Sequence, residues 1–405
     1  MRNINNFAPA GLFFMAQGFL AHAALGMELD ILIPPGIPGL GEPAPLTVIG
    51  HTPGLSQPVP WQFGGFTLQP HHNAGFGYNS APGATTTGSN VLSATPSLVV
   101  ADVPAGFGAY LEGTTSYLPS ETAQDTSGYT VAVGEAAVLP QETITIAGGY
   151  ARTTETGFGL STLDLSKPLS FTVGSLDAGD KIAAGMFTVT PDVSYTRAVF
   201  DALPDEDSWQ IRGRTQVEFA PGGPMRVVTL AEATQSSYRD ESFDASSYAA
   251  LVGIDDDATG LWEFRILGGA AWRQPRTGRA LVAPVVEAAA SWAPTELDNV
   301  SLTAAHEVDD PDQIGAAGYM LTQGQLSYQH ELQRTLDFTS SFSAAHAAYF
   351  GTRLNESLFD TSAQVSWHVN TGLALNASYA FADRQANYLR AANEHVFTLT
   401  AVWTP

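Results

Sequence analysis

The 405-residue chain is 44% hydrophobic, but only 14% of its residues are charged, well below the roughly 25% that is usual in soluble domains. Its net charge of −23, with Lys167 and Lys181 as the only lysines, excludes the basic face that nucleic-acid phosphates need, so we expect no nucleic-acid partner. The absence of cysteine excludes disulfide and thiolate-metal chemistry. Low charge in so long a chain is typical of a protein that confines its charges to loops and a water-filled interior.

The first residues have the features of a secretory signal. Arg2 supplies a positive charge, residues 8–20 form a short apolar run, and Ala21, His22 and Ala23 give the small-x-small pattern of a cleavage site. We therefore predict a signal peptide over residues 1–23, rather than a short membrane anchor or a buried helix. No later segment offers the ~20 continuous apolar residues of a spanning helix, so a membrane location would require a closed barrel.

Residues 24–60 are unusually rich in proline, which prevents regular pairing and favours an extended chain. The prolines of this segment are Pro34, Pro35, Pro38, Pro43, Pro45, Pro53, Pro58 and Pro60. We expect a proline-rich periplasmic tail. Three roles stay open for it: a passive spacer, an arm that docks periplasmic polysaccharide-export proteins, or a plug of the lumen.

Residues 61–405 consist of short runs in which apolar and polar residues alternate. From Trp209 to Phe219 every second residue is apolar or small, whereas Arg212 and Arg214 belong to the polar set. A period of two predicts a strand, because successive side chains in a pleated chain point to opposite faces. Eighteen such runs follow one another, among them 62–78, 168–176 and 182–200. Glu135 and Pro191 do not fit the pattern of their strands, and we expect β-bulges there.

Short connections alternate with longer polar ones along this region. Residues 140–141, 220–223 and 370–372 are short and turn-like, whereas 153–166 and 307–318 are long. Such alternation is typical of outer-membrane barrels, which have short periplasmic turns and longer extracellular loops. The sequence thus predicts an all-β fold, a transmembrane antiparallel β-barrel of about 18 strands (16–18) in the bacterial outer membrane.

Aromatic residues end many of the apolar stripes, as expected for the girdles at the two membrane interfaces. The predicted girdle consists of Trp209, Phe219, Trp262, Trp272, Trp292, Trp367, Tyr379 and Trp403. Outer-membrane lipids and lipopolysaccharide are therefore the expected surroundings. The last strand, ending at Trp403, is similar to the C-terminal signal by which barrel-assembly machinery recognises its substrates.

The polar stripes contain charges and amides that we expect to line the lumen. These candidates are Glu112, Arg212, Arg214, Glu218, Glu263, Arg265, Glu287, Gln323, Gln325, Gln329 and Asn376. In a wide barrel both signs of charge can stay hydrated, and they bias the passage of ions. The alternative is that they form salt bridges that only stabilise the wall.

No pattern of catalytic chemistry is present. We find no nucleophile elbow, no zinc-binding His-Glu-x-x-His and no phosphate-binding loop. His71 and His72 are neighbours in a strand and should point to opposite faces, which disfavours a metal site. We therefore expect no catalytic residues, no metal and no cofactor.

Several strand and turn sequences resemble the putative β-barrel porin 2 family of bacterial outer-membrane proteins, over roughly residues 70–404. The similar stretches are NAGFGYNS (73–80), TPSLV (95–99), YARTT (150–154), ASYAFADRQAN (377–387) and EHVFTLTA (394–401). The resemblance implies a channel, and we expect it to export exopolysaccharide through its polar lumen, since the family is often associated with such export. A general or weakly ion-selective diffusion porin is the alternative, and a barrel-embedded hydrolase or a blocked adhesive barrel are further rivals.

Overall fold

The structure is a computed structural model, and the barrel that it describes is built almost entirely from strands. It describes residues 29, 32–34, 36–40, 60–85, 87–102, 104–155, 158, 160, 167–256, 261–310 and 318–405. The predicted signal peptide lies outside these residues. Within them no helix is long and apolar enough to cross a membrane.

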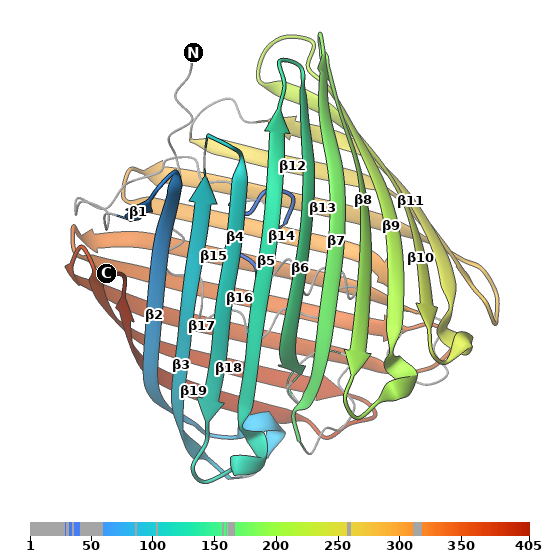
Figure 1. Ribbon diagram of the computed structural model, residues 1–405. Helices are drawn as coiled ribbons and strands as arrows, with labels where there is room; N and C mark the ends of the chain where they lie inside the picture. Colours follow the sequence, from blue (N-terminus) through green and yellow to red (C-terminus); the bar gives the residue numbers. More distant parts are fainter. Residues whose placement is uncertain are drawn as a thin grey trace.

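Nineteen strands form one sheet, in which each strand pairs with its sequence neighbours (Figure 1). The strands are β1 (Trp61–Phe63), β2 (Phe66–Asn79), β3 (Ser89–Asp102), β4 (Phe107–Tyr117), β5 (Thr126–Val138), β6 (Glu142–Glu155), β7 (Leu169–Ala184), β8 (Phe187–Phe200), β9 (Ser208–Phe219), β10 (Met225–Tyr238), β11 (Ala245–Asp256), β12 (Trp262–Pro275), β13 (Leu281–Thr295), β14 (Asp298–Asp309), β15 (Tyr319–Gln333), β16 (Leu336–Tyr349), β17 (Asn355–Asn370), β18 (Leu373–Ala386) and β19 (Ala392–Trp403).

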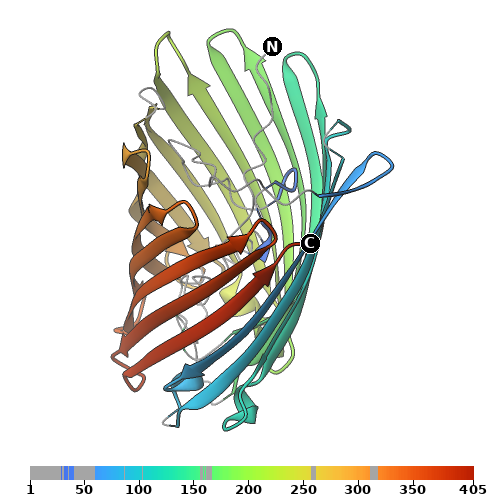
Figure 2. The ribbon, with the colours of Figure 1, turned by 90° about the vertical axis from the view of Figure 1, so that its left-hand side faces the viewer.

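The sheet closes on itself, because β19 pairs antiparallel with β2 from Val396↔Asn79 to Trp403↔His72. Strands β2–β19 therefore form a closed antiparallel barrel of 18 strands, seen from two sides in Figures 1 and 2. Because the barrel of β2–β19 is closed, it has no unpaired strand edge. An unpaired edge would be unfavourable in the membrane, because lipid cannot hydrogen-bond to backbone groups. This confirms the predicted fold class and strand number.

The connections alternate in length as predicted. At one end of the barrel the turns between strands are two to five residues long, and at the other end the connections have five to thirteen residues. Single turns of 3-10 helix lie in four of the longer connections: η1 (Pro82–Ala84), η2 (Thr122–Gln124), η3 (Pro204–Glu206) and η4 (Glu241–Phe243). The strand that closes the barrel, β19, ends on the short-turn side, which is the periplasmic side of an outer-membrane barrel.

Two predicted strand boundaries were wrong. The runs 168–176 and 182–200 are in fact β7 and β8, joined by the turn at Gly185 and Met186. Asp177, Asp180 and Lys181 suggested a turn, yet they continue β7 in register with β6. The run 62–78 is likewise two strands, since Gly64, with a φ of 63°, turns β1 back onto β2.

The two faces of the wall differ in chemistry. On β6 and β7, Ile146 and Leu176 are each 65% exposed on the outer face, as suits contact with lipid. Their neighbours on the inner face, such as Ala147 and Val173, are buried. Because paired residues of adjacent strands share a face, the register carries this assignment around the whole barrel.

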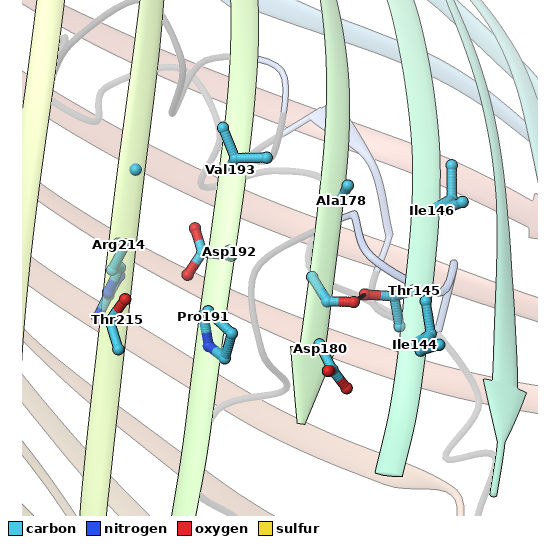
Figure 3. A pocket seen from close by; sticks show the side chains of 12 residues that line it. Ile144, Thr145, Ile146, Ala178, Asp180, Pro191, Asp192, Val193, Arg214 and Thr215 are labelled. Carbon is cyan, nitrogen blue, oxygen red and sulfur yellow. Dashed lines mark hydrogen bonds between the residues drawn. The ribbon is translucent and has the colours of Figure 1, made fainter. Parts of the chain in front are cut away.

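The expectation of bulges at Pro191 and Glu135 was wrong. The β7–β8 register omits partners between Gly179↔Asp192 and Ile182↔Val189 without a shift, and Pro191 lies in this gap while it stays paired with Thr215 of β9. A shallow, mainly apolar hollow of about 430 Å³ lies over this interruption, bordered by Ile144, Ala178 and Val193 (Figure 3). On β5, Glu135 stays in regular register with Phe107 and Ile146 and points outward near the periplasmic end.

Candidate functional site: the barrel interior

All eleven predicted lumen residues lie on the inner face by register. Glu112 and Asn376 are buried, Gln329 is exposed, and the others are half-buried. The inner face carries more charge than the sequence analysis assigned to it. The additional residues are Glu155, Asp177, Lys181, Asp192, Arg226, Glu232, Asp255, Arg273, Glu307, Asp309, Glu331, Asp337, Glu356, Asp360, Arg384 and Glu394.

Arginines gather on the inner face of β9–β12. Arg214 lies between Asp192 of β8 and Glu232 of β10 in the register. Arg212, two residues away on the same face, lies between the hydroxyl residues Ser194 and Thr234. Arg214 therefore has a carboxylate on each neighbouring strand, whereas Arg212 has a hydroxyl residue on each.

A second row of alternating charge lies closer to the periplasmic turns. Arg226 contacts Asp255 at 3.2 Å and Glu218 at 3.7 Å. Arg265 is opposite Asp255 in the register, and its guanidinium donates to Gln216 Oε1 at 2.7 Å. Some of the predicted lumen charges thus form salt bridges along the wall. The sequence analysis had left this role open as the alternative to biasing the passage of ions.

The wall formed by β14–β19 contributes amides, hydroxyls and carboxylates. Gln323 donates to Glu307 Oε1 at 3.4 Å, and Gln325 lies between Thr303 and Ser343. Asn376 is flanked by Ser366 and Thr400. These groups can donate and accept hydrogen bonds, so they can replace water around a hydrophilic solute.

Glu112 is held on the opposite wall by a neighbour of its own strand. Tyr110 Oη donates to Glu112 Oε2 at 2.6 Å, and both side chains are buried. They share the inner face because they are two residues apart. Glu263 and Glu287 lie on the inner faces of β12 and β13, opposite Ser291 and Leu267 respectively.

The described part of the proline-rich segment lies inside the barrel and not in a periplasmic tail. Leu29, Ile33, Ile37 and Leu40 are buried in one cluster with the inner wall. Their partners on the wall are Tyr110, Ala132, Ala147, Ala151, Phe171 and Val173. The short blue pieces within the barrel in Figures 1 and 2 are the described residues of this segment (29, 32–34 and 36–40), which we call the strap. Lumen contact was one of the three open roles, and the domain boundaries 1–23, 24–60 and 61–405 stay predictions.

A second segment reaches across the interior. Leu160, in the connection between β6 and β7, is fully buried in a cluster with Tyr319, Tyr349 and Leu358. These partners belong to β15, β16 and β17, on the far side of an 18-strand barrel from β6. Leu160 therefore lies inside the barrel, against the wall far from β6 and near the extracellular end.

The predicted girdle residues lie on the outer face. Trp262 stacks on Trp292 with ring centroids 5.0 Å apart, near the periplasmic turns, and Trp272 stacks on Tyr248 at the other end. His72 also points outward and stacks on Trp403, whereas His71 points inward, beside Thr404. Phe219, Trp367 and Trp403 lie at the periplasmic ends of their strands, and Trp209 lies at the extracellular end of β9. Tyr379 is mid-strand in β18 and belongs to neither belt.

A closed 18-strand barrel with an apolar exterior, a charged interior and alternating turn lengths defines a porin-like channel of the bacterial outer membrane. The model of the family described as "Putative beta-barrel porin 2" matches residues 56–402. The chain belongs to this family, as the resemblance of its strand sequences predicted. Family and fold are those of a channel rather than an enzyme. No curated protein matches the chain.

Solved structures of similar fold are distant in sequence. The crystal structure of OccK2 (OpdF) from Pseudomonas aeruginosa has a TM-score of 0.48 and 11% identity, covering 83% of this chain and 98% of that one. OpdK from the same organism has a TM-score of 0.47 and 9% identity, with coverages of 84% and 99%. The siderophore receptor PirA has a TM-score of 0.44 and 9% identity, with coverages of 83% and 80%.

Proposed function

We propose that this protein is a diffusion pore for small hydrophilic solutes, with a weak preference for cations. The observation that carries the proposal is the interior itself. Its wall is lined with charged, amide and hydroxyl groups, while the strap and the β6–β7 connection both take up space in the bore. A bore narrowed in two places suits small solutes better than a polymer chain, and no observation favours polymer export.

The preference for cations follows from the balance of charge. On the described inner face the carboxylates outnumber the arginines and Lys181, even though Arg212, Arg214, Arg226, Arg265 and Arg273 are concentrated on neighbouring strands. A pore wall with excess negative charge concentrates cations and repels anions. The arginines then act locally, by making one side of the path favourable for anionic groups.

The reversal potential in a salt gradient tests this proposal. The purified protein in a planar bilayer with a KCl gradient should conduct and should show a modest preference for K⁺ over Cl⁻. Replacing both Arg212→Gln and Arg214→Gln removes two inner positive charges, so the preference for K⁺ should increase.

The control is Arg239→Gln, which removes a charge from an exposed side chain near Asp207, outside the bore. It should leave the reversal potential unchanged. A preference for Cl⁻ in the unmodified protein would contradict the selectivity, and a complete lack of conductance would contradict the pore itself.

A further inference from the structure

We propose that the strap stays docked on the inner wall of β4–β7 while the pore conducts, and sets the conductance by narrowing the bore on that side. This inference rests on the proposed diffusion pore. It adds the chain's own segment as a built constriction and directs the solute path to the uncovered part of the wall, which includes the arginines of β9–β12.

Small residues of the wall form the groove that receives the strap. A Cβ atom at Gly134 would lie 1.9 Å from the carbonyl oxygen of Pro38, and its three nearest atoms would all belong to Pro38. A Cβ at Gly149 would lie 2.7 Å from Leu29 Cδ2, and one at Gly108 would lie 2.9 Å from Pro38 Cδ. Glycine at these three positions therefore lets the strap backbone approach the wall more closely than any other residue would.

The strap itself matches the groove along its length. Leu29 and Ile33 lie against Gly149 of β6, whereas Pro38 lies against Gly134 of β5, nearer to the periplasmic turns. Gly39, with a φ of 78°, brings the chain against Ala147 and Thr145. The apolar side chains between these points are buried against Tyr110, Phe171 and Val173. A contact so continuous indicates a docked part of the native pore rather than a loose tail.

The covered wall carries few arginines. Among the described residues, the inner face of β4–β6 carries Glu112 and, at its extracellular end, Glu155, and β7 adds Asp177 and Lys181, whereas five of the six arginines of the inner face lie on β9–β12. A strap on the apolar wall leaves the charged and amide-rich walls exposed to the solute. The constriction and the selectivity of the pore are therefore produced by different parts of the same barrel wall.

The main test is Gly134→Ala, whose added methyl group would collide with the backbone of Pro38 and so displace the strap. Single-channel conductance of the full mature chain should rise by roughly 1.5-fold or more, because a chain segment with side chains about 10 Å across is a large share of such a bore. Deleting residues 29–40 should give the same increase. The matched control, Gly213→Ala, adds a methyl group where no atom lies within 4 Å and should leave the conductance unchanged.

A disulfide lock tests whether the strap is docked during conduction. The chain has no cysteine, so the double variant Leu29→Cys and Gly149→Cys offers one pair to oxidise. The oxidised variant should conduct like the unmodified protein, and reduction should change nothing. If the oxidised variant conducts much less than the unmodified protein, the proposal is wrong. It is also wrong if neither Gly134→Ala nor the deletion changes the conductance. If no variant passes ions, the diffusion pore fails; if all variants pass ions equally, only the strap inference fails.

Discussion

At the scale of single residues, several carboxylates lie close together at the extracellular rim, outside the bore. Glu206 ends the 3-10 turn η3 between β8 and β9, close to Asp205 and to Asp240 of the next connection. Partial burial, together with the negative charges of Asp205 and Asp240, raises the pKa of Glu206 to about 7. At this rim, a carboxyl group therefore changes its charge near neutral pH.

The pH dependence of this connection follows from that shift. Because the folded state holds the proton of Glu206 more tightly than the unfolded chain, the stability of the turn should fall as the pH rises from about 4.5 to about 7. The side chain is partly exposed, so we expect an effect on the order of 1 kcal/mol, or roughly a fivefold loss of amide protection. Hydrogen exchange of residues 201–207, corrected for intrinsic rates, measures it between pH 5 and pH 8.

Two variants decide whether Glu206 is the cause. Glu206→Gln should keep the protection of residues 201–207 high at pH 8 and remove most of its pH dependence. Glu121→Gln, in the separate connection between β4 and β5, should leave it unchanged. A Glu206→Gln protein that loses protection with pH as the unmodified protein does would assign the effect to another group.

The alternation of single residues predicted which way side chains point, but not what they touch. Period two was enough to assign Arg212, Glu218 and Arg265 to the polar face, and the register places them on the inner face. Their partners lie on other strands, so Arg265 could not be matched with Gln216 before the register was known. Whether these residues contact a solute stays a prediction.

At the scale of elements, the β6–β7 connection is held at both sides of the barrel. It is the longest connection between strands, and both Phe158 and Leu160 are fully buried. Leu160 packs on β15–β17, so at this residue the connection contacts the far wall inside the barrel. Its length predicted an extracellular loop, but the sequence contained no signal for the far wall that it reaches.

Weakening this contact should make the pore noisier. Leu160→Ala removes side-chain atoms from a fully buried site, a change that typically costs about 2–5 kcal/mol of packing free energy. We expect larger current fluctuations in single-channel recordings and faster proteolysis within residues 156–168. Leu332→Ala, at an exposed position near the periplasmic turns, is the control. Recordings as quiet as those of the unmodified protein would mean that Leu160 does not hold the connection in place.

Sequence analysis misplaced the elements whose residue types indicate more than one structure. The predicted break at residues 177–181 falls inside β7: Asp177 and Lys181 point inward, where a strand with one wet face accommodates charges, and Asp180 points outward near the periplasmic turn. The prolines of residues 24–60 correctly excluded a strand in the described part of that segment. They could not indicate the groove, which depends on Gly108, Gly134 and Gly149 of three strands brought together by the fold.

At the scale of the whole molecule, the barrel depends on one non-local pairing. Every other strand pairing in the barrel joins strands adjacent in sequence, whereas β19 pairs with β2 across the length of the chain. Until that pairing forms, the sheet has two free edges, one on β2 and one on β18 or β19. Their backbone groups are unpaired, and lipid cannot hydrogen-bond to them. The hairpin of β1 and β2 takes no part in this closure. β1 pairs only with Phe66, Thr67 and Leu68 of β2, whereas β19 pairs with the part of β2 from His72 to Asn79.

Closure should therefore be sensitive to the C-terminal end and tolerant at the hairpin. Removing residues 392–405 deletes β19 and both of its ladders, so we expect no heat-modifiable barrel in the outer-membrane fraction on electrophoresis. Removing residues 61–65 deletes β1 and its turn, yet leaves the pairs from His72↔Trp403 to Asn79↔Val396 in place, so a folded barrel should still be recovered. A folded, membrane-inserted barrel without β19 would show that β2 and β18 can pair directly, and that the strand number of the pore is not fixed by the last strand.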